Sequence, residues 1–103
     1  MTFTKEQKAV LKKAIRHYGF DSQTDIAIEE MSELTKAIIK DRRYQSMETL
    51  ENIYEEIADV LIIVEQLRLA FYPEAVDRFV RSKIARLEQR IGEKENGKQQ
   101  EDN

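Results

Sequence analysis

The chain has 103 residues, and its 20 acidic side chains outnumber its 17 lysines and arginines to give a formal net charge of −3. This length suits one domain. The acidic balance argues against a nucleic-acid partner, because general nucleic-acid binders carry a clear basic excess. The chain has no cysteine and a single histidine, His17. Disulfides, thiolate sites and imidazole clusters are therefore excluded, so any bound metal must be held by oxygen.

The first residues lack an apolar stretch after their positive charge, which argues against a secretory signal. The longest apolar run, residues 60–64, is far too short to cross a bilayer. We therefore expect a cytoplasmic protein without a membrane partner. Only three glycines and one proline interrupt a chain rich in Glu, Lys, Arg, Ile and Leu. This composition predicts an all-α protein.

The first predicted helix begins after Thr4, which forms a capping-box pattern with Gln7. Gly19 is placed to end this helix, because glycine suits the backbone conformation just past a helix C-terminus. Asp21 and Ser22 are both good N-caps for a second helix, which is expected to run to about residue 42.

The third helix is expected over about 46–71, because Glu48 and Thr49 suit the first turn of a helix that begins near Ser46. Pro73 then starts a fourth helix, since proline is tolerated in a first turn but not in a helix interior. Gly92 is expected to end that helix. Residues 1–92 are therefore predicted to form one helical domain, and the polar stretch 93–103 a disordered tail.

Two of the predicted helices carry apolar residues outside their main apolar face. In the second helix Ile28 and Ile39 lie roughly opposite the main stripe, and in the third helix Ile62, Ile63 and Leu69 fall outside it. A small domain with second apolar faces gains from subunit association. The pattern predicts a homo-oligomer.

Two pairs of acidic residues stand out, Glu30 with Glu33 and Glu56 with Asp59. Each pair has i, i+3 spacing, so its two carboxylates point to the same side of a helix. Both pairs border the apolar stripes, where partial burial and like charge raise carboxyl pKa values. A divalent cation would relieve this repulsion, and Mg²⁺ suits carboxylate ligands and phosphate. Either pair alone is better explained as part of a solvated helix face, and only the two pairs together favour a metal site.

A basic strip on the fourth predicted helix complements the acids. Lys83, Arg86 and Arg90 follow helical spacing along one side of it. Such cations can neutralise and orient the oxygens of a polyphosphate. The alternative is a solvated basic face that pairs with acidic neighbours.

The two acidic motifs together resemble the signature of the MazG-like all-α nucleoside triphosphate pyrophosphohydrolases. The resemblance covers roughly residues 18–91. It includes Gln23 ahead of the first acidic motif, the segments around both motifs, and the closing helix with Lys83 and Arg90.

The resemblance implies a four-helix bundle that hydrolyses a (deoxy)nucleoside triphosphate between its α- and β-phosphates, giving a monophosphate and pyrophosphate. It implies Mg²⁺ as cofactor, with Mn²⁺ as a substitute, and a homo-oligomer, a tetramer rather than a dimer. The implied metal ligands and catalytic residues are Glu30, Glu33, Glu56 and Asp59. The implied substrate contacts are Lys83 and Arg90 on phosphate and Gln23 on the base or ribose, and the basic strip adds Arg86 as a candidate phosphate contact.

Two alternative functions stay open at this point. Phosphoribosyl-ATP pyrophosphohydrolase shares the helical fold and the acidic pairs, and a non-catalytic helical metal-binding or interaction module would use the acids only to shape its surface. A coiled-coil adaptor is disfavoured, because no a/d heptad persists for three repeats. The preferred base and sugar are not specified by the sequence, since base selection depends on pocket shape and a few hydrogen bonds.

Overall fold

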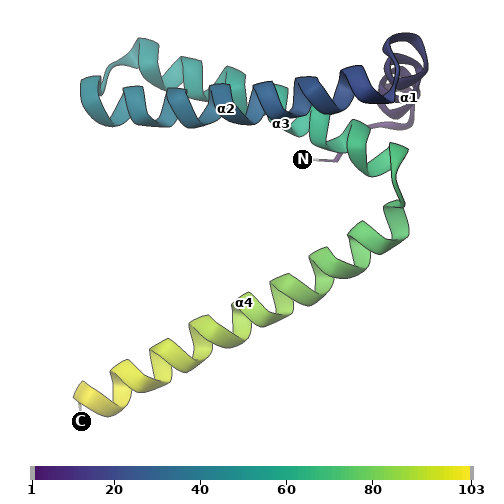
Figure 1. The fold of residues 1–103 in the computed structure, drawn as a ribbon. Helices are drawn as coiled ribbons and strands as arrows, with labels where there is room; N and C mark the ends of the chain where they lie inside the picture. Colours follow the sequence, from purple (N-terminus) through teal and green to yellow (C-terminus); the bar gives the residue numbers. More distant parts are fainter. Residues whose placement is uncertain (1, 103) are drawn as a thin grey trace. The chain divides into compact units, whose positions relative to one another are not determined.

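The computed structural model describes residues 2–102, with side chains over 2–97, and within that range it contains four α-helices and no strand. The all-α prediction is confirmed. The helices are α1 (Lys5–Tyr18), α2 (Phe20–Tyr44), α3 (Met47–Ala70) and α4 (Pro73–Asp102) (Figure 1). They form two compact units, Met1–Phe71 and Tyr72–Asn103. In the part of the chain that is described, no helix has the length and apolar character needed to span a membrane.

The start of α1 and its end are as the sequence predicts. The Thr4 side chain accepts a hydrogen bond from the backbone N–H of Gln7, and the Gln7 side chain accepts one from the backbone N–H of Thr4. Gly19 ends α1 with φ of 93°, a conformation that glycine adopts at little cost.

The predicted start of α2 at Asp21 or Ser22 is wrong. Gly19 is at once the residue that ends α1 and the residue that precedes α2, so α2 begins directly at Phe20 without a side-chain cap. Asp21 lies in the first turn, where its negative charge faces the positive end of the helix dipole. One glycine therefore replaces the short loop that the cap residues had suggested.

A two-residue turn joins α2 to α3. Gln45 ends α2 in the left-handed conformation, with φ of 46°. Ser46 then caps α3 and forms a capping box with Thr49. The buried Thr49 hydroxyl also donates to Asp41 Oδ1 at 2.8 Å, which ties the start of α3 to the last turns of α2. The polar groups of the turn are thus paired with one another.

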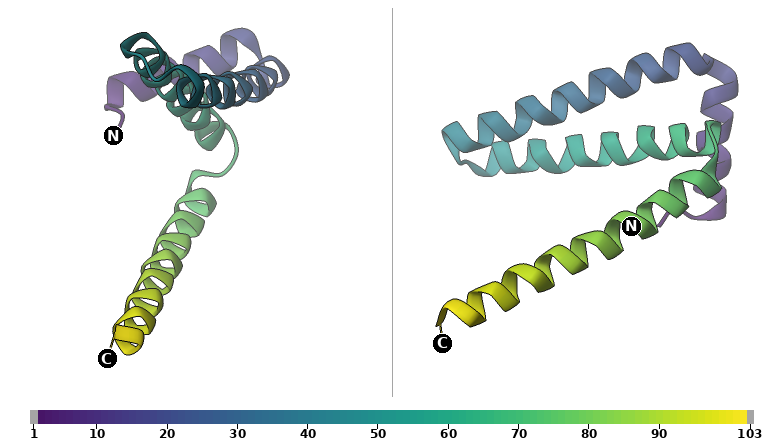
Figure 2. Two further views of the ribbon diagram at one scale, coloured as in Figure 1. Left: turned by 90° about the vertical axis from the view of Figure 1, so that its left-hand side faces the viewer. Right: turned by 60° about the horizontal axis from the view of Figure 1, so that its bottom comes forward.

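Helices α2 and α3 lie side by side and antiparallel, and α1 lies across the end where α2 begins and α3 ends (Figures 1 and 2). Ala27 and Ala37 of α2 are each only 2% exposed. Small residues at these points let the two helix backbones approach closely. Leu11 and Ile63, 7% and 2% exposed, complete the buried apolar core of this unit, so the predicted place of Ile63 outside the main apolar face of α3 is wrong. The core is thin, because a chain this short buries only a modest fraction of its surface.

A hydrogen bond between buried amides crosses from α2 to α3 near α1. The Gln23 amide donates through Nε2 to Gln66 Oε1 at 2.6 Å, and both side chains are at most 6% exposed. This pair fixes the register of the two antiparallel helices, because a slip would leave two buried amides unpaired.

Helix α4 forms the second unit by itself. It begins at Pro73, as predicted, but the predicted end at Gly92 is wrong, because the helix continues to Asp102 through the stretch expected to be disordered. Glycine in a helix interior costs only about 1 kcal/mol relative to alanine. The surrounding Glu, Lys and Gln residues favour helix, and Gln89 donates to Glu93 across Gly92. The division into a domain of residues 1–92 and a tail stays a prediction.

Candidate metal centre

Three carboxylates from two helices meet in the middle of the α2–α3 pair. Glu30 comes from α2, while Glu56 and Asp59 lie one turn apart on α3. One carboxylate oxygen from each lies within 4.8 Å of the other two. The i, i+3 spacing on α3 directs both of its acids toward α2, as the sequence predicted. Three of the four predicted metal ligands are therefore brought together.

The Glu30 carboxyl is partly buried. Burial raises its pKa above the usual glutamate range, and the charges of Asp59, Glu56 and Glu29 raise it further. A hydrogen bond with Asp59 acts in the same direction, because it favours the protonated form of Glu30. Without a cation, Glu30 therefore holds its proton more strongly than a separate glutamate would.

Glu56 carries the most informative atom of the cluster. Its Oε2 is buried and has no hydrogen-bond partner. Burial raises the pKa of Glu56, and the charges of Asp59, Glu33 and Glu55 add to the effect. A buried acceptor without a donor destabilises the folded state. A cation is one group that could satisfy this oxygen and relieve the repulsion at the same time.

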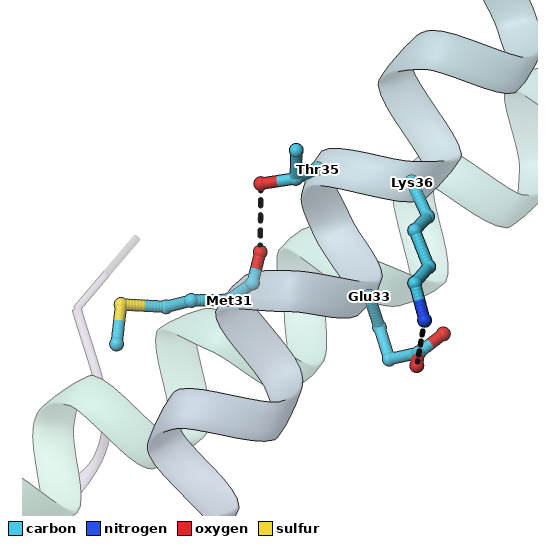
Figure 3. Close-up of polar contacts among 4 residues, drawn as sticks. All are labelled: Met31, Glu33, Thr35 and Lys36. Atoms are coloured by element: carbon cyan, nitrogen blue, oxygen red, sulfur yellow. Dashed lines mark hydrogen bonds and ion pairs between the residues drawn. The ribbon is translucent and has the colours of Figure 1, made fainter.

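Glu33 takes a different direction from the other three acids. Its carboxylate pairs with Lys36 at 3.5 Å on the exposed side of α2, where the Glu33 side chain is 46% exposed (Figure 3). Met31 extends away from this pair in the same view. Glu33 is still close enough for its charge to raise the Glu56 pKa. An exposed i, i+3 pair is worth at most about 0.5 kcal/mol, so little free energy holds Glu33 away from the cluster.

The remaining predicted site residues lie elsewhere. Gln23 is buried two helical turns before Glu30, bonded to Gln66, and its Oε1 atom is buried without a hydrogen-bond partner. Sequence reasoning did not identify Gln66 as its partner. Lys83, Arg86 and Arg90 lie on α4, and their contact with phosphate stays a prediction.

Comparison of the chain with protein-family models, with curated proteins and with solved structures finds no match. The resemblance to the MazG-like enzymes therefore depends on the motifs of this sequence alone.

Proposed function

We propose that the protein is a Mg²⁺-dependent nucleoside triphosphate pyrophosphohydrolase of the MazG-like type, which cleaves a (deoxy)nucleoside triphosphate to its monophosphate and pyrophosphate. The observation that carries this proposal is the group formed by Glu30, Glu56 and Asp59, in which carboxylate oxygens from two helices lie within 4.8 Å of one another. The buried, unpartnered Oε2 of Glu56 is the second support.

The chemistry of the three acids fits a hard divalent cation. Ionised carboxylates are acceptors only, and Mg²⁺ prefers oxygen ligands. Glu30, Glu56 and Asp59 would hold the ion. Glu33 would join them by exchanging its exposed contact with Lys36 for the cluster. When bound, Mg²⁺ supplies charge neutralisation for the triphosphate and lowers the pKa of water.

The side chains have separate roles in this proposal. Phosphoryl transfer depends on positioning and electrostatic stabilisation more than on covalent chemistry. Glu30, Glu56 and Asp59 would hold the cation, which would neutralise the charge of the triphosphate. We assign Lys83, Arg86 and Arg90 to the outer phosphate oxygens, where a guanidinium can form two parallel hydrogen bonds.

The proposal includes the four-helix bundle of this family, with α4 as the fourth helix. Apolar residues recur along α4 at helical spacing, as a bundle helix requires. They are Val76, Val80, Ile84, Leu87 and Ile91.

The proposal also includes assembly into a homo-oligomer, a tetramer in preference to a dimer. Several large apolar side chains of α2 and α3 are 40–67% exposed, more than a thin core explains. They include Ile28, Met31, Ile39, Leu61 and Ile62.

The test is to incubate wild-type protein and Glu56→Gln with a panel of NTPs and dNTPs, with Mg²⁺ and separately with Mn²⁺, and to identify the products. Monophosphate and pyrophosphate from the wild type alone would support the proposal. Cleavage of phosphoribosyl-ATP but of no ordinary nucleotide would favour the histidine-pathway enzyme. If calorimetric titration shows no saturable binding of Mg²⁺ or Mn²⁺ and no substrate is cleaved, the protein is a non-catalytic module.

A further inference from the structure

A pocket of about 730 Å³ lies at the turn end of the α2–α3 pair. Both helices line it. Residues that bear on its chemistry are Lys40 and Tyr44 of α2 and Glu48, Glu51, Asn52 and Glu55 of α3. No sequence motif predicts this pocket, and none of its lining residues has a role in the proposed reaction so far.

The pocket begins one helical turn from the carboxylate cluster. Asn52 precedes Glu56 by four residues, and Glu55 precedes Asp59 by four, so each pair shares one side of α3. Four residues of helix rise about 6 Å. The charge of Glu55 is felt at Glu56, whose pKa it raises. A ligand held at the cluster by one end would therefore reach the pocket with a group only a few ångströms away.

The same relation holds along α2. Lys40 follows Glu33 by seven residues, about two helical turns, so it lies on the side of α2 from which the charge of Glu33 reaches Glu56. The cluster and the pocket thus lie along one side of the helix pair, with acids first and a mixed polar and aromatic lining after them.

The lining does not suit phosphate. Glu48, Glu51 and Glu55 outnumber the single cation, Lys40, so a polyphosphate would meet net negative charge there. The lining suits an uncharged aromatic group that forms hydrogen bonds. Tyr44 is 62% exposed, and although the Arg43 guanidinium lies over its ring at 6.0 Å from the centre, the ring still offers a stacking surface. The Asn52 amide offers both donors and an acceptor, as a base edge requires.

We propose that this pocket is the nucleobase subsite of the pyrophosphohydrolase, with the base stacked on Tyr44 and its edge against Asn52 while the phosphates lie at the carboxylate cluster. The inference rests on the proposed function and deepens it, because it states which end of the helix pair receives the base. It replaces the base or ribose contact that the resemblance implies for Gln23, which is buried against Gln66 at the other end of the pair.

The test compares Tyr44→Ala and Asn52→Leu with wild type on two substrates, a cleaved nucleoside triphosphate and ribose 5-triphosphate, which lacks the base. We expect each variant to raise KM for the nucleotide by about 10-fold or more, because stacking of a base on an aromatic side chain contributes that much to binding. The kinetics with ribose 5-triphosphate should not change. Tyr54→Ala is the matched control, since Tyr54 is equally exposed on α3 and does not line the pocket. Circular dichroism of each variant checks the fold.

The outcomes separate the two proposals. If wild type cleaves nucleotides but the variants leave KM unchanged, or raise it equally for ribose 5-triphosphate, the base lies elsewhere and the pyrophosphohydrolase proposal stands. If wild type cleaves no nucleotide with Mg²⁺ or Mn²⁺, the proposed function fails and the subsite fails with it. Two pocket variants are used so that a folding defect in one does not decide the result.

Discussion

The α2–α3 turn and the carboxylate cluster differ in how their polar groups are paired. At the turn, the Thr49 hydroxyl, Asp41 and the Ser46 cap pair with one another over distances of 2.8–3.2 Å. Two turns along α3, Glu56 and Asp59 meet Glu30 with like charge, and a buried oxygen has no partner. The turn is satisfied by the chain itself and stabilises the fold. The cluster is not satisfied by the chain, which is typical of a functional site.

The largest expected effect comes from breaking the cluster. Glu56→Gln should lower kcat/KM for the cleaved nucleotide by about 1,000-fold, because a cation site supplies several kcal/mol of transition-state stabilisation. Steady-state kinetics measure the loss, and circular dichroism should show unchanged helicity. Glu29→Gln is the control, since Glu29 is exposed beside Glu30 but outside the cluster. Retained activity with a large drop in melting temperature would make Glu56 a structural residue.

The second prediction concerns pH and metal. The pKa values of Glu30 and Glu56 are raised in the folded state, so their contribution to stability is greatest in acid and is lost as pH rises through the raised values. In EDTA, the Glu30→Gln/Glu56→Gln double variant should therefore gain in melting temperature over wild type as pH increases. Mg²⁺ at about 100 times its Kd should stabilise wild type alone, by about 2.7 kcal/mol. Equal stabilisation of the double variant would place the ion elsewhere.

A third prediction sharpens the distinction between the cluster and the pocket beside it. The pocket carboxylates are acceptors only, so a base with an exocyclic amino group should be preferred. We expect about a 10-fold higher kcat/KM for dCTP than for dUTP, which corresponds to the 1–3 kcal/mol that one good base-edge contact provides. Competition assays with the two nucleotides in one reaction measure the ratio. A preference for dUTP would show that donors, and not these acceptors, select the base.

The smallest expected effect lies at the turn. Asp41→Ala removes the acceptor of the Thr49 hydroxyl and should lower the free energy of unfolding by about 1 kcal/mol. Chemical denaturation measures the change. Asp41→Asn keeps an acceptor oxygen and is the control, which should unfold close to wild type. A large loss of kcat/KM together with a small change in the free energy of unfolding would mean that the turn affects the geometry of the cluster.

The sequence predicted most helix ends because the end signals are local. Thr4, Gly19, Ser46 and Pro73 act through their own backbone or through a residue three positions away. The end of α4 was missed because Gly92 in a long polar helix costs too little to stop it.

The site was predicted less completely, because side-chain contacts between helices are not local. Spacing placed Glu30, Glu56 and Asp59 on facing sides, and they meet. The same spacing could not show that Glu33 pairs with Lys36, since that depends on a rotamer choice worth little free energy. The Gln23–Gln66 bond depends on the helix register, which no single-helix pattern specifies.

The single glycine between α1 and α2 limits which insertions and deletions homologous chains can tolerate. Gly19 is the one residue between the two helices, so no loop can absorb an insertion. One inserted residue would turn α1 by about 100° about its axis and move Leu11 out of the core. Homologous chains should therefore vary freely in the length of their polar C-terminal stretch while keeping the spacing from Leu11 to Gln23 constant. An alignment with frequent gaps at this junction would indicate that α1 is an interchangeable attachment instead of part of the fold.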